Sequence, residues 1–247
     1  MPMNALAPSV PASVFLTLCL CFSTALGNTA LDAALERQQF RYSATYGNDT
    51  KVGELRITVQ RLENDIEVTA TLHVSNALAK LFLKEYSIRN RFEISLSGIL
   101  LSSGEARRPG NPDVISSYVV DRERGTIRYA NQDGIPIPAE SVLDTSDFPI
   151  MLATSDLAKL EGRDVLVASH SKVSHYIYKA PERDVVTVGG ISYDTWKITR
   201  SKRGETGRQV TTWLTADARR IPLLIVSTKR GADTVFRLLD PPEPSER

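Results

Sequence analysis

Apolar and polar residues alternate along most of the chain from about residue 38 onward. Phe40, Tyr42 and Ala44 take every second position, and the segment 55–60 repeats the pattern with Leu, Ile and Val. A period of two places successive side chains on opposite faces of a β-strand, so that one face is buried and the other is solvated. The pattern therefore predicts antiparallel strands that each turn one face toward a hydrophobic core.

Clusters of Gly, Asn and Asp separate the alternating segments and mark turns. Gly189-Gly190 fits a two-residue hairpin loop, and residues 231–233 fit a slightly longer one. Residues 131–144 are expected to be a loop, because Pro136 and Pro138 oppose a central strand. Strands are expected at residues 40–46, 55–60, 66–74, 86–96, 99–105, 114–121, 126–130, 164–170, 172–179, 184–188, 191–200, 209–214, 223–229 and 234–239. We predict a mainly β protein, a single domain of about a dozen antiparallel strands that forms a curved sheet, a half-barrel or two packed sheets.

Two segments break the alternation and predict short helices. Residues 76–83 are rich in Ala and Leu, and Asn76 is available as an N-cap. Residues 147–160 form the second segment, in which Pro149 falls in the first turn, where a missing N–H is harmless, and Gly162 follows the end. Each helix is expected to bury an apolar stripe against the sheet.

Helices that lie over the concave face of a curved sheet would form a lid above an apolar pocket. Under this hypothesis the ligand-binding side chains are Phe82, Phe148, Trp196 and Trp213. The alternative is that these side chains fill the space completely, because close packing is the rule in protein interiors. The helices would then only cap the core.

The first 27 residues have the pattern of a cleavable signal peptide. The first charged residue is Asp32, Val14 to Leu26 is a short apolar run, and small residues at 25 and 27 place cleavage before Asn28. A membrane anchor is the alternative, but the run is shorter than the roughly 20 apolar residues that span a bilayer. We therefore expect an exported, periplasmic protein with a folded domain at 28–239 and a disordered tail at 240–247, which has no apolar side chains to bury.

The cysteine content agrees with this compartment. Cys19 and Cys21 both lie in the predicted signal peptide, and leucines stand where a lipidation site needs a small residue. The mature chain would then contain no disulfide, no cysteine nucleophile and no thiolate metal ligand. A secreted eukaryotic domain of this size often carries disulfides, so a bacterial periplasm is favoured.

Positive and negative charges nearly balance, with 30 Lys and Arg against 29 Asp and Glu. The overall charge therefore gives no electrostatic reason to expect binding to nucleic acid or to an anionic membrane surface. Positive charge is concentrated in one stretch, residues 200–208. We interpret this stretch as a solvated hairpin loop, with a partner-binding patch as the alternative.

Candidate catalytic groups are few. Asp144, Asp147 and Asp156 could perform general acid/base catalysis, but Asp144 and Asp147 flank a predicted helix start, and capping of that helix is the preferred explanation. The histidines His73, His170 and His175 are not in a spacing typical of a metal site. No nucleophile or phosphate-binding motif is present, so we expect no metal and no cofactor, and an enzyme, such as a hydrolase, would be of an unfamiliar type.

Several sequence signatures in the chain are typical of strand turns. They are a strand pair at 120–129, Ser-Asp-Phe-Pro-Ile-Met-Leu at 146–152, Val-Thr-Val-Gly-Gly at 186–190, Tyr-Asp-Thr-Trp-Lys-Ile at 193–198, Thr-Trp-Leu-Thr-Ala-Asp at 212–217 and Arg-Ile-Pro-Leu at 220–223. Together they resemble the exported bacterial family called domain of unknown function 3108, over roughly residues 40–239. The resemblance implies a periplasmic antiparallel β fold with no established activity and provides no catalytic residue.

Three functional classes remain open on the sequence. The first is a non-enzymatic binding or cell-envelope assembly module, whose partner is an unknown envelope protein. The second is a carrier of a lipid or another apolar small molecule in the concavity of the sheet. The third is an enzyme, which would require clustered titratable groups in a polar cleft.

Overall fold

The structure is a computed structural model of the chain. It describes residues 32–33, 35–47, 50–76, 80, 85–95, 98–108, 111, 113–130, 132–138, 142–145, 152, 155–169 and 171–243. The predicted signal peptide, Phe82 and Phe148 lie outside the described residues.

The described residues form one sheet of sixteen strands. They are β1 (Gln39–Tyr46), β2 (Thr50–Leu62), β3 (Asp65–Val74), β4 (Tyr86–Ser95), β5 (Gly98–Arg107), β6 (Val114–Asp121), β7 (Thr126–Tyr129), β8 (Ile135–Pro136), β9 (Val142–Thr145), β10 (Asp164–Ala168), β11 (Val173–Tyr178), β12 (Glu182–Val188), β13 (Ile191–Lys202), β14 (Arg208–Thr215), β15 (Pro222–Lys229) and β16 (Ala232–Leu238). The prediction of a mainly β, largely antiparallel protein is confirmed.

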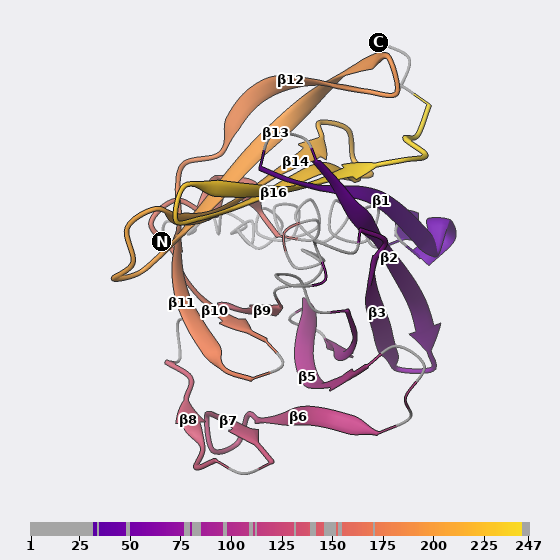
Figure 1. The fold of residues 1–247 in the computed structure, drawn as a ribbon. Coiled ribbons are helices and arrows are strands. Elements are labelled where there is room, and N and C mark those ends of the chain that lie inside the picture. Colours follow the sequence, from indigo (N-terminus) through magenta and orange to yellow (C-terminus); the bar gives the residue numbers. More distant parts are fainter. Residues whose placement is uncertain are drawn as a thin grey trace, which may run out of the picture.

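The sheet consists of two meanders that meet at the pairing of the first and last strands. Strands β8 to β1 lie in reverse chain order, β1 pairs with β16, and β15, β14, β13, β11, β10 and β9 follow. Strand β12 pairs with β13 beside this path, and β9 with β10 is the parallel pair. Figure 1 shows that the sheet is strongly curved, with β6 to β8 at the bottom and the β12–β13 hairpin at the top.

Two strands, β8 and β9, lie in the segment predicted as a loop. β8 has only two residues, and its Pro136 stands in an edge strand, where a missing N–H does no harm. These two strands end the sheet, which is not closed by a ladder between them in the described residues. The two ends approach at a seam, where the hydroxyl of Tyr129 donates a hydrogen bond to the carbonyl of Ser169 over 2.9 Å.

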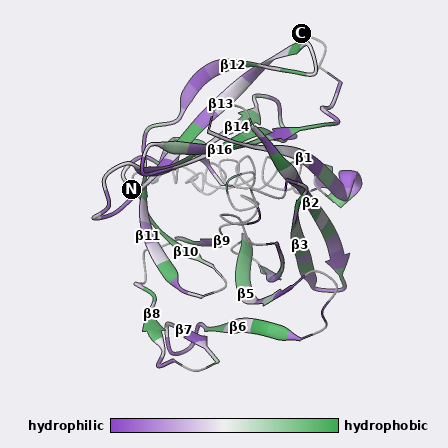
Figure 2. Ribbon diagram, in the orientation of Figure 1, coloured by the Kyte–Doolittle hydropathy of each residue, from purple (hydrophilic) through white to green (hydrophobic). Residues whose placement is uncertain are grey.

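The alternating pattern buries two clusters of side chains. The larger core extends along the meander, and β3 shows the pattern that produces it, with Ile66, Val68 and Ala70 buried and their neighbours half-exposed. The smaller core lies between β10, β11, β13 and β14 and includes Val165, Tyr178 and Leu214. Figure 2 shows the same alternation as bands of hydrophobic and hydrophilic residues along β1 to β3.

Helical structure is sparse in the described residues. Most of the predicted helix at 76–83 lies outside them, although Lys80 donates a backbone bond to Asn76 over 3.1 Å, as in a helical turn. Within 147–160 the described part contains a 3-10 turn at Leu157–Lys159, capped by the Asp156 carboxylate. Residues 35–37, just before β1, are helical. No helix among the described residues is long and apolar enough to cross a membrane.

Candidate functional site

The two tryptophans predicted to line an apolar pocket lie on opposite faces of the β13–β14 ladder. Trp213 pairs with Lys197, whereas Trp196 pairs with Leu214. Directly opposed residues of an antiparallel pair share a face, so neighbouring positions along one strand do not. Trp196 packs on the smaller core and Trp213 on the larger. The structure therefore does not bring these two side chains into one common lining, and the ligand-binding role of all four aromatic residues stays a prediction.

Each tryptophan also has a polar neighbour from β12. The guanidinium of Arg183 lies 4.0 Å from the centre of the Trp196 ring, within the range of a cation–π interaction. The indole Nε1 of Trp213 donates to Oδ2 of Asp184 over 2.9 Å. This hydrogen bond lowers the pKa of Asp184 by favouring the charged carboxylate. Both contacts tie β12 to the β13–β14 ladder.

The predicted acidic cluster does not assemble as a catalytic site in the described residues. Asp144 is fully buried in β9, where Nη1 of Arg200 donates to its Oδ2 over 2.9 Å, and the Arg200 side chain is 6% exposed. Burial raises the pKa of the Asp144 carboxyl, and the Arg200 guanidinium opposes that rise. Asp144 is therefore a strand residue in a buried ion pair, which corrects the expectation that it belongs to a loop, whereas the predicted helix start after it lies outside the described residues.

The other members of the cluster have different positions. Asp156 accepts a hydrogen bond from the Ala158 N–H over 3.2 Å and caps the 3-10 turn at Leu157–Lys159, a role that was not predicted for this residue. Asp147 lies outside the described residues, as does His170. His73 and His175 are exposed on β3 and β11. Among the described residues, no group of three His, Cys, Asp or Glu side chains is placed to hold a metal ion.

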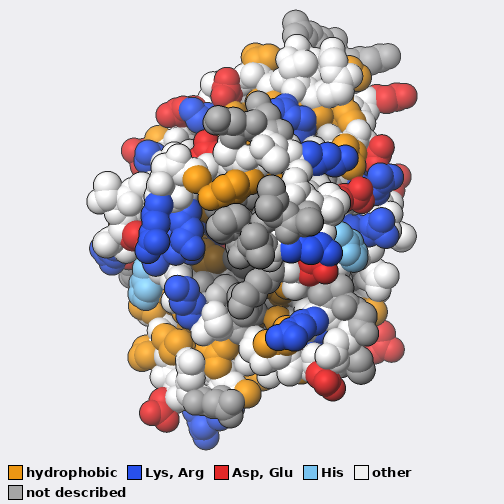
Figure 3. Space-filling model, viewed as in Figure 1, with side chains coloured by type: hydrophobic (Ala, Val, Ile, Leu, Met, Phe, Trp, Pro, Cys, Tyr) orange, Lys and Arg blue, Asp and Glu red, His pale blue; other side chains and the backbone are white. Residues whose placement is uncertain are grey.

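A cationic groove lies between β11 and the β13–β14 hairpin. Its volume is about 340 Å³, and its charged or titratable lining consists of Lys172, His175, Lys202 and Arg203. The groove forms here because the backbone N–H of Arg203 donates to the carbonyl of His175 over 2.9 Å, which holds the hairpin against β11. Figure 3 shows Lys and Arg side chains beside a histidine on the left flank of this view, over β11.

Two carboxylates modulate the charge of this cationic groove. Asp164 lies 3.5 Å from Arg203, and Glu205 forms an ion pair with Lys202 and lies 3.6 Å from Arg208. Contact with Lys202 lowers the pKa of Glu205, so this carboxyl stays ionised at neutral pH. The result is a mixed-charge surface with an excess of cations, which can bind carboxylates or phosphates by charge-assisted hydrogen bonds.

Sequence reasoning found half of the cationic groove. The stretch 200–208 was identified by its charge, but Arg200 at its start is buried, and Lys202 and Arg203 of the hairpin join Lys172 and His175 of the β10–β11 region. Arg200 and Lys202 share one face of β13, and their burial differs because the strand runs from the core toward the surface. The partners on β11 could not be found from local sequence.

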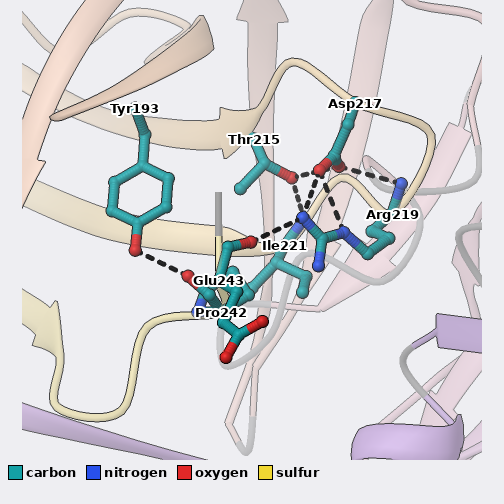
Figure 4. A network of polar contacts seen from close by, with 7 residues as sticks. All are labelled: Tyr193, Thr215, Asp217, Arg219, Ile221, Pro242 and Glu243. Atoms are coloured by element: carbon teal, nitrogen blue, oxygen red, sulfur yellow. Dashed lines mark hydrogen bonds and ion pairs between the residues drawn. The ribbon is translucent and has the colours of Figure 1, made fainter. Parts of the chain in front are cut away.

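A second polar cluster, the β14–β15 loop cluster, is formed by Thr215, Asp217 and Arg219. The Thr215 hydroxyl donates to Asp217 over 2.8 Å and accepts the Ile221 N–H over 2.9 Å. The Asp217 carboxylate accepts three further bonds from Arg219, from its backbone N–H and from Nε and Nη2 of its guanidinium. Figure 4 shows these contacts, and the guanidinium reaches from them to the carbonyl of Glu243.

This loop coincides with two of the sequence signatures described above, those at 212–217 and 220–223. The Thr-x-Asp spacing explains the local structure, since short polar side chains close turns by bonding to nearby backbone and side-chain groups. The family model described as a protein of unknown function, DUF3108, matches residues 41–235. The chain belongs to the DUF3108 family. The suspected family resemblance is thereby confirmed over most of the folded domain.

Comparison with solved structures gives further matches to this DUF3108 chain, fifteen in all. One is the crystal structure of a β-barrel-like protein of domain of unknown function DUF1849 from Brucella abortus. It is 7% identical, covers 81% of this chain and 94% of its own, and superimposes with a TM-score of 0.45. No curated protein matches the chain. The family assignment therefore provides no activity for the DUF3108 chain, and its function must be inferred from its own surface.

Proposed function

We propose that this DUF3108 protein is an exported, non-enzymatic binding module of the cell envelope that recognises an acidic segment of a partner protein in its cationic groove. The observation that carries the proposal is the gathering of Lys172, His175, Lys202 and Arg203 from two separate parts of the sheet around one depression. Export is supported by the first 27 residues, which have the composition of a signal peptide.

The mixed charge of the groove favours a protein partner over a lipid surface. Asp164 and Glu205 lie among the cations and would repel a uniformly anionic membrane. A partner protein can place its own carboxylates opposite the cations and leave neutral or basic groups opposite the two acids. Ser174 at the same depression adds a hydroxyl that can both donate and accept hydrogen bonds.

The test uses a fluorescent decapeptide of glutamate as a defined acidic probe, with binding followed by fluorescence anisotropy. The intact protein should bind the probe, and the affinity should fall as salt rises from about 20 to about 300 mM, because exposed charges are screened. The double charge reversal Lys172→Glu with Arg203→Glu should weaken binding about tenfold or more.

A matched control separates the cationic groove from the overall charge. Lys51→Glu with Arg61→Glu makes the same change in net charge on β2, where both residues are exposed. This control should bind the acidic probe with an affinity within about twofold of that of the original protein, because salt screens the interaction between the probe and distant surface charges. Equal loss in both double variants would refute a specific site. Tighter binding to phosphatidylglycerol vesicles than to the peptide would assign the groove to a lipid surface instead.

A further inference from the structure

The chain beyond β16 is held against the sheet by side chains that bond to its backbone carbonyls. The hydroxyl of Tyr193 donates to the carbonyl of Pro242 over 2.6 Å, and Nη2 of Arg219 donates to the carbonyl of Glu243 over 3.0 Å. Nη2 of Arg37 donates to the carbonyl of Asp240. Figure 4 shows Tyr193 and the β14–β15 loop cluster on either side of this C-terminal segment. Three backbone carbonyls of this segment thus accept hydrogen bonds from side chains in three different parts of the fold.

Two of the donors, Tyr193 and Arg219, are also held by contacts with other parts of the protein. Tyr193 is 5% exposed and belongs to the larger core, so its ring is held by packing. The Arg219 guanidinium is oriented by the carboxylate of Asp217, which in turn accepts the Thr215 hydroxyl. Rigid donors lose little conformational entropy when they bind, which is a property of recognition surfaces.

The surface also has a place for a proline ring. A Cβ atom at Gly189 would lie 3.4 Å from Cγ of Pro241, an ordinary van der Waals separation, so this ring lies directly beside the β12–β13 turn. The sequence continues Pro241-Pro242-Glu243-Pro244. Proline-rich segments favour the extended polyproline II conformation, which has no internal hydrogen bonds and leaves its carbonyls free for donors. Aromatic hydroxyls and grooves that accept proline rings are the usual means by which proteins recognise such segments.

We propose that the surface formed by Tyr193, Arg219, Arg37 and Gly189 is a recognition groove for extended proline-rich segments of a partner protein, and that the C-terminal segment 240–243 is its resident, competing occupant. The contacts are hydrogen bonds to backbone carbonyls and packing against one proline ring. A segment of another chain with carbonyls and a proline at the same spacing can therefore make the same contacts. The groove is separate from the cationic groove, and the C-terminal segment lies outside the region 41–235 that the family model matches.

The experiment measures binding of a fluorescent peptide with the sequence of residues 239–247, Leu-Asp-Pro-Pro-Glu-Pro-Ser-Glu-Arg. A variant that ends at Leu239 should bind it saturably, because its groove is empty. The intact protein should bind at least about tenfold more weakly, since a tethered segment competes at an effective concentration in the millimolar range. Tyr193→Phe in the shortened protein should weaken binding about threefold to tenfold by removing one hydrogen bond.

Controls keep the result specific. A peptide with alanine at all three prolines should bind at least about threefold more weakly, because it loses the preformed extended conformation. The double reversal Lys172→Glu with Arg203→Glu should leave peptide binding unchanged, which separates this groove from the proposed function. Should the shortened protein fail to fold, the full-length variant Pro241→Gly with Pro242→Ser takes its place and should also bind the peptide better than the intact protein. Binding that fails to saturate at about 1 mM peptide in the folded variant, or that ignores both Tyr193→Phe and the prolines, would overturn the proposal.

Discussion

The larger core and the smaller core between β10, β11, β13 and β14 bury their side chains by different chemistry. The larger core is filled by residues such as Phe92 and Leu101, whose stabilisation grows with apolar area. The smaller core adjoins the ion pair of Asp144 and Arg200. Among the buried polar residues of the described chain, these two carry a charge. The stability contributed by apolar packing depends on the volume of the side chains. The stability contributed by a buried ion pair depends on the presence of both charged partners.

The largest effect is expected from breaking the ion pair. Asp144→Ala leaves the Arg200 guanidinium buried without its carboxylate, which costs about 3–5 kcal/mol of unfolding free energy. Urea unfolding followed by circular dichroism measures the loss. Asp156→Ala serves as a control, because the loss of an exposed cap costs about 1 kcal/mol. Similar values for the two variants would mean that the pair contributes no more than a surface carboxylate.

The matching double variant sharpens the difference between the cores. Asp144→Leu with Arg200→Met replaces both charges by apolar side chains of similar size and should recover most of the loss, because no charge then remains buried alone. A double variant as unstable as Asp144→Ala would show that the cost lies in packing around the site. The smaller core would then behave like the larger one.

In the larger core, Leu101→Ala should cost about 2–5 kcal/mol through lost transfer free energy and the cavity left behind. Leu101 is fully buried, so relaxation around the cavity is limited. The same urea unfolding measures the loss. A second substitution should not restore stability in this core, because an additional Phe92→Leu change would enlarge the cavity. Recovery of stability in that double variant would contradict the distinction between the cores.

A smaller effect is expected from overpacking at Gly104. A Cβ atom at this position would lie 2.5 Å from both the Asn90 side chain and the Tyr118 ring, which are joined by a buried hydrogen bond of 2.7 Å. Gly104→Ala should therefore cost about 1–3 kcal/mol. Combining it with Tyr118→Ala should reduce that cost, as measured by the shift in the thermal midpoint. An unchanged cost would place the strain elsewhere.

The smallest effect concerns the seam. Burial raises the pKa of Tyr129 to about 12, above its ordinary value of 10.0. A raised folded-state pKa means that the phenol favours folding below pH 10 and that this contribution is lost as pH rises toward 12. Stability should therefore fall less steeply over this range in Tyr129→Phe than in the original protein. Unfolding is measured at several pH values from about 9 to about 12, which bracket the two pKa values. If the unfolding free energy falls equally steeply with pH in both proteins, the prediction is contradicted.

The sequence predicts local strand structure well and tertiary pairing poorly. The alternation at Phe40, Tyr42 and Ala44 matches β1, and Gly189-Gly190 forms the expected two-residue turn, with Val188 paired to Ile191. The hairpin near 231 is tighter than predicted, because Arg230 adopts a positive φ and Lys229 pairs directly with Ala232. The length of this turn depends on a positive φ that Arg rarely adopts, so the turn length could not be predicted from the residue types.

The candidate sites depended on contacts between distant residues. Asp144 and Arg200 are separated by 56 positions, and no local period connects them. The same holds for the cationic groove, whose two halves belong to β11 and to the β13–β14 hairpin. The C-terminal segment was predicted from composition to be disordered, and that prediction for 240–247 stays open as a whole. The contacts at Pro242 and Glu243 come from Tyr193 and Arg219, which composition does not reveal.

The pairing of β1 with β16 determines how the molecule responds to mechanical force. Tyr42 lies opposite Leu238 and Tyr46 opposite Thr234, so the start of β1 and the end of β16 are at the same end of this antiparallel ladder. Tension applied through the two chain ends would load one pair of residues at a time and peel the strands apart, whereas a parallel arrangement would load all bonds together in shear.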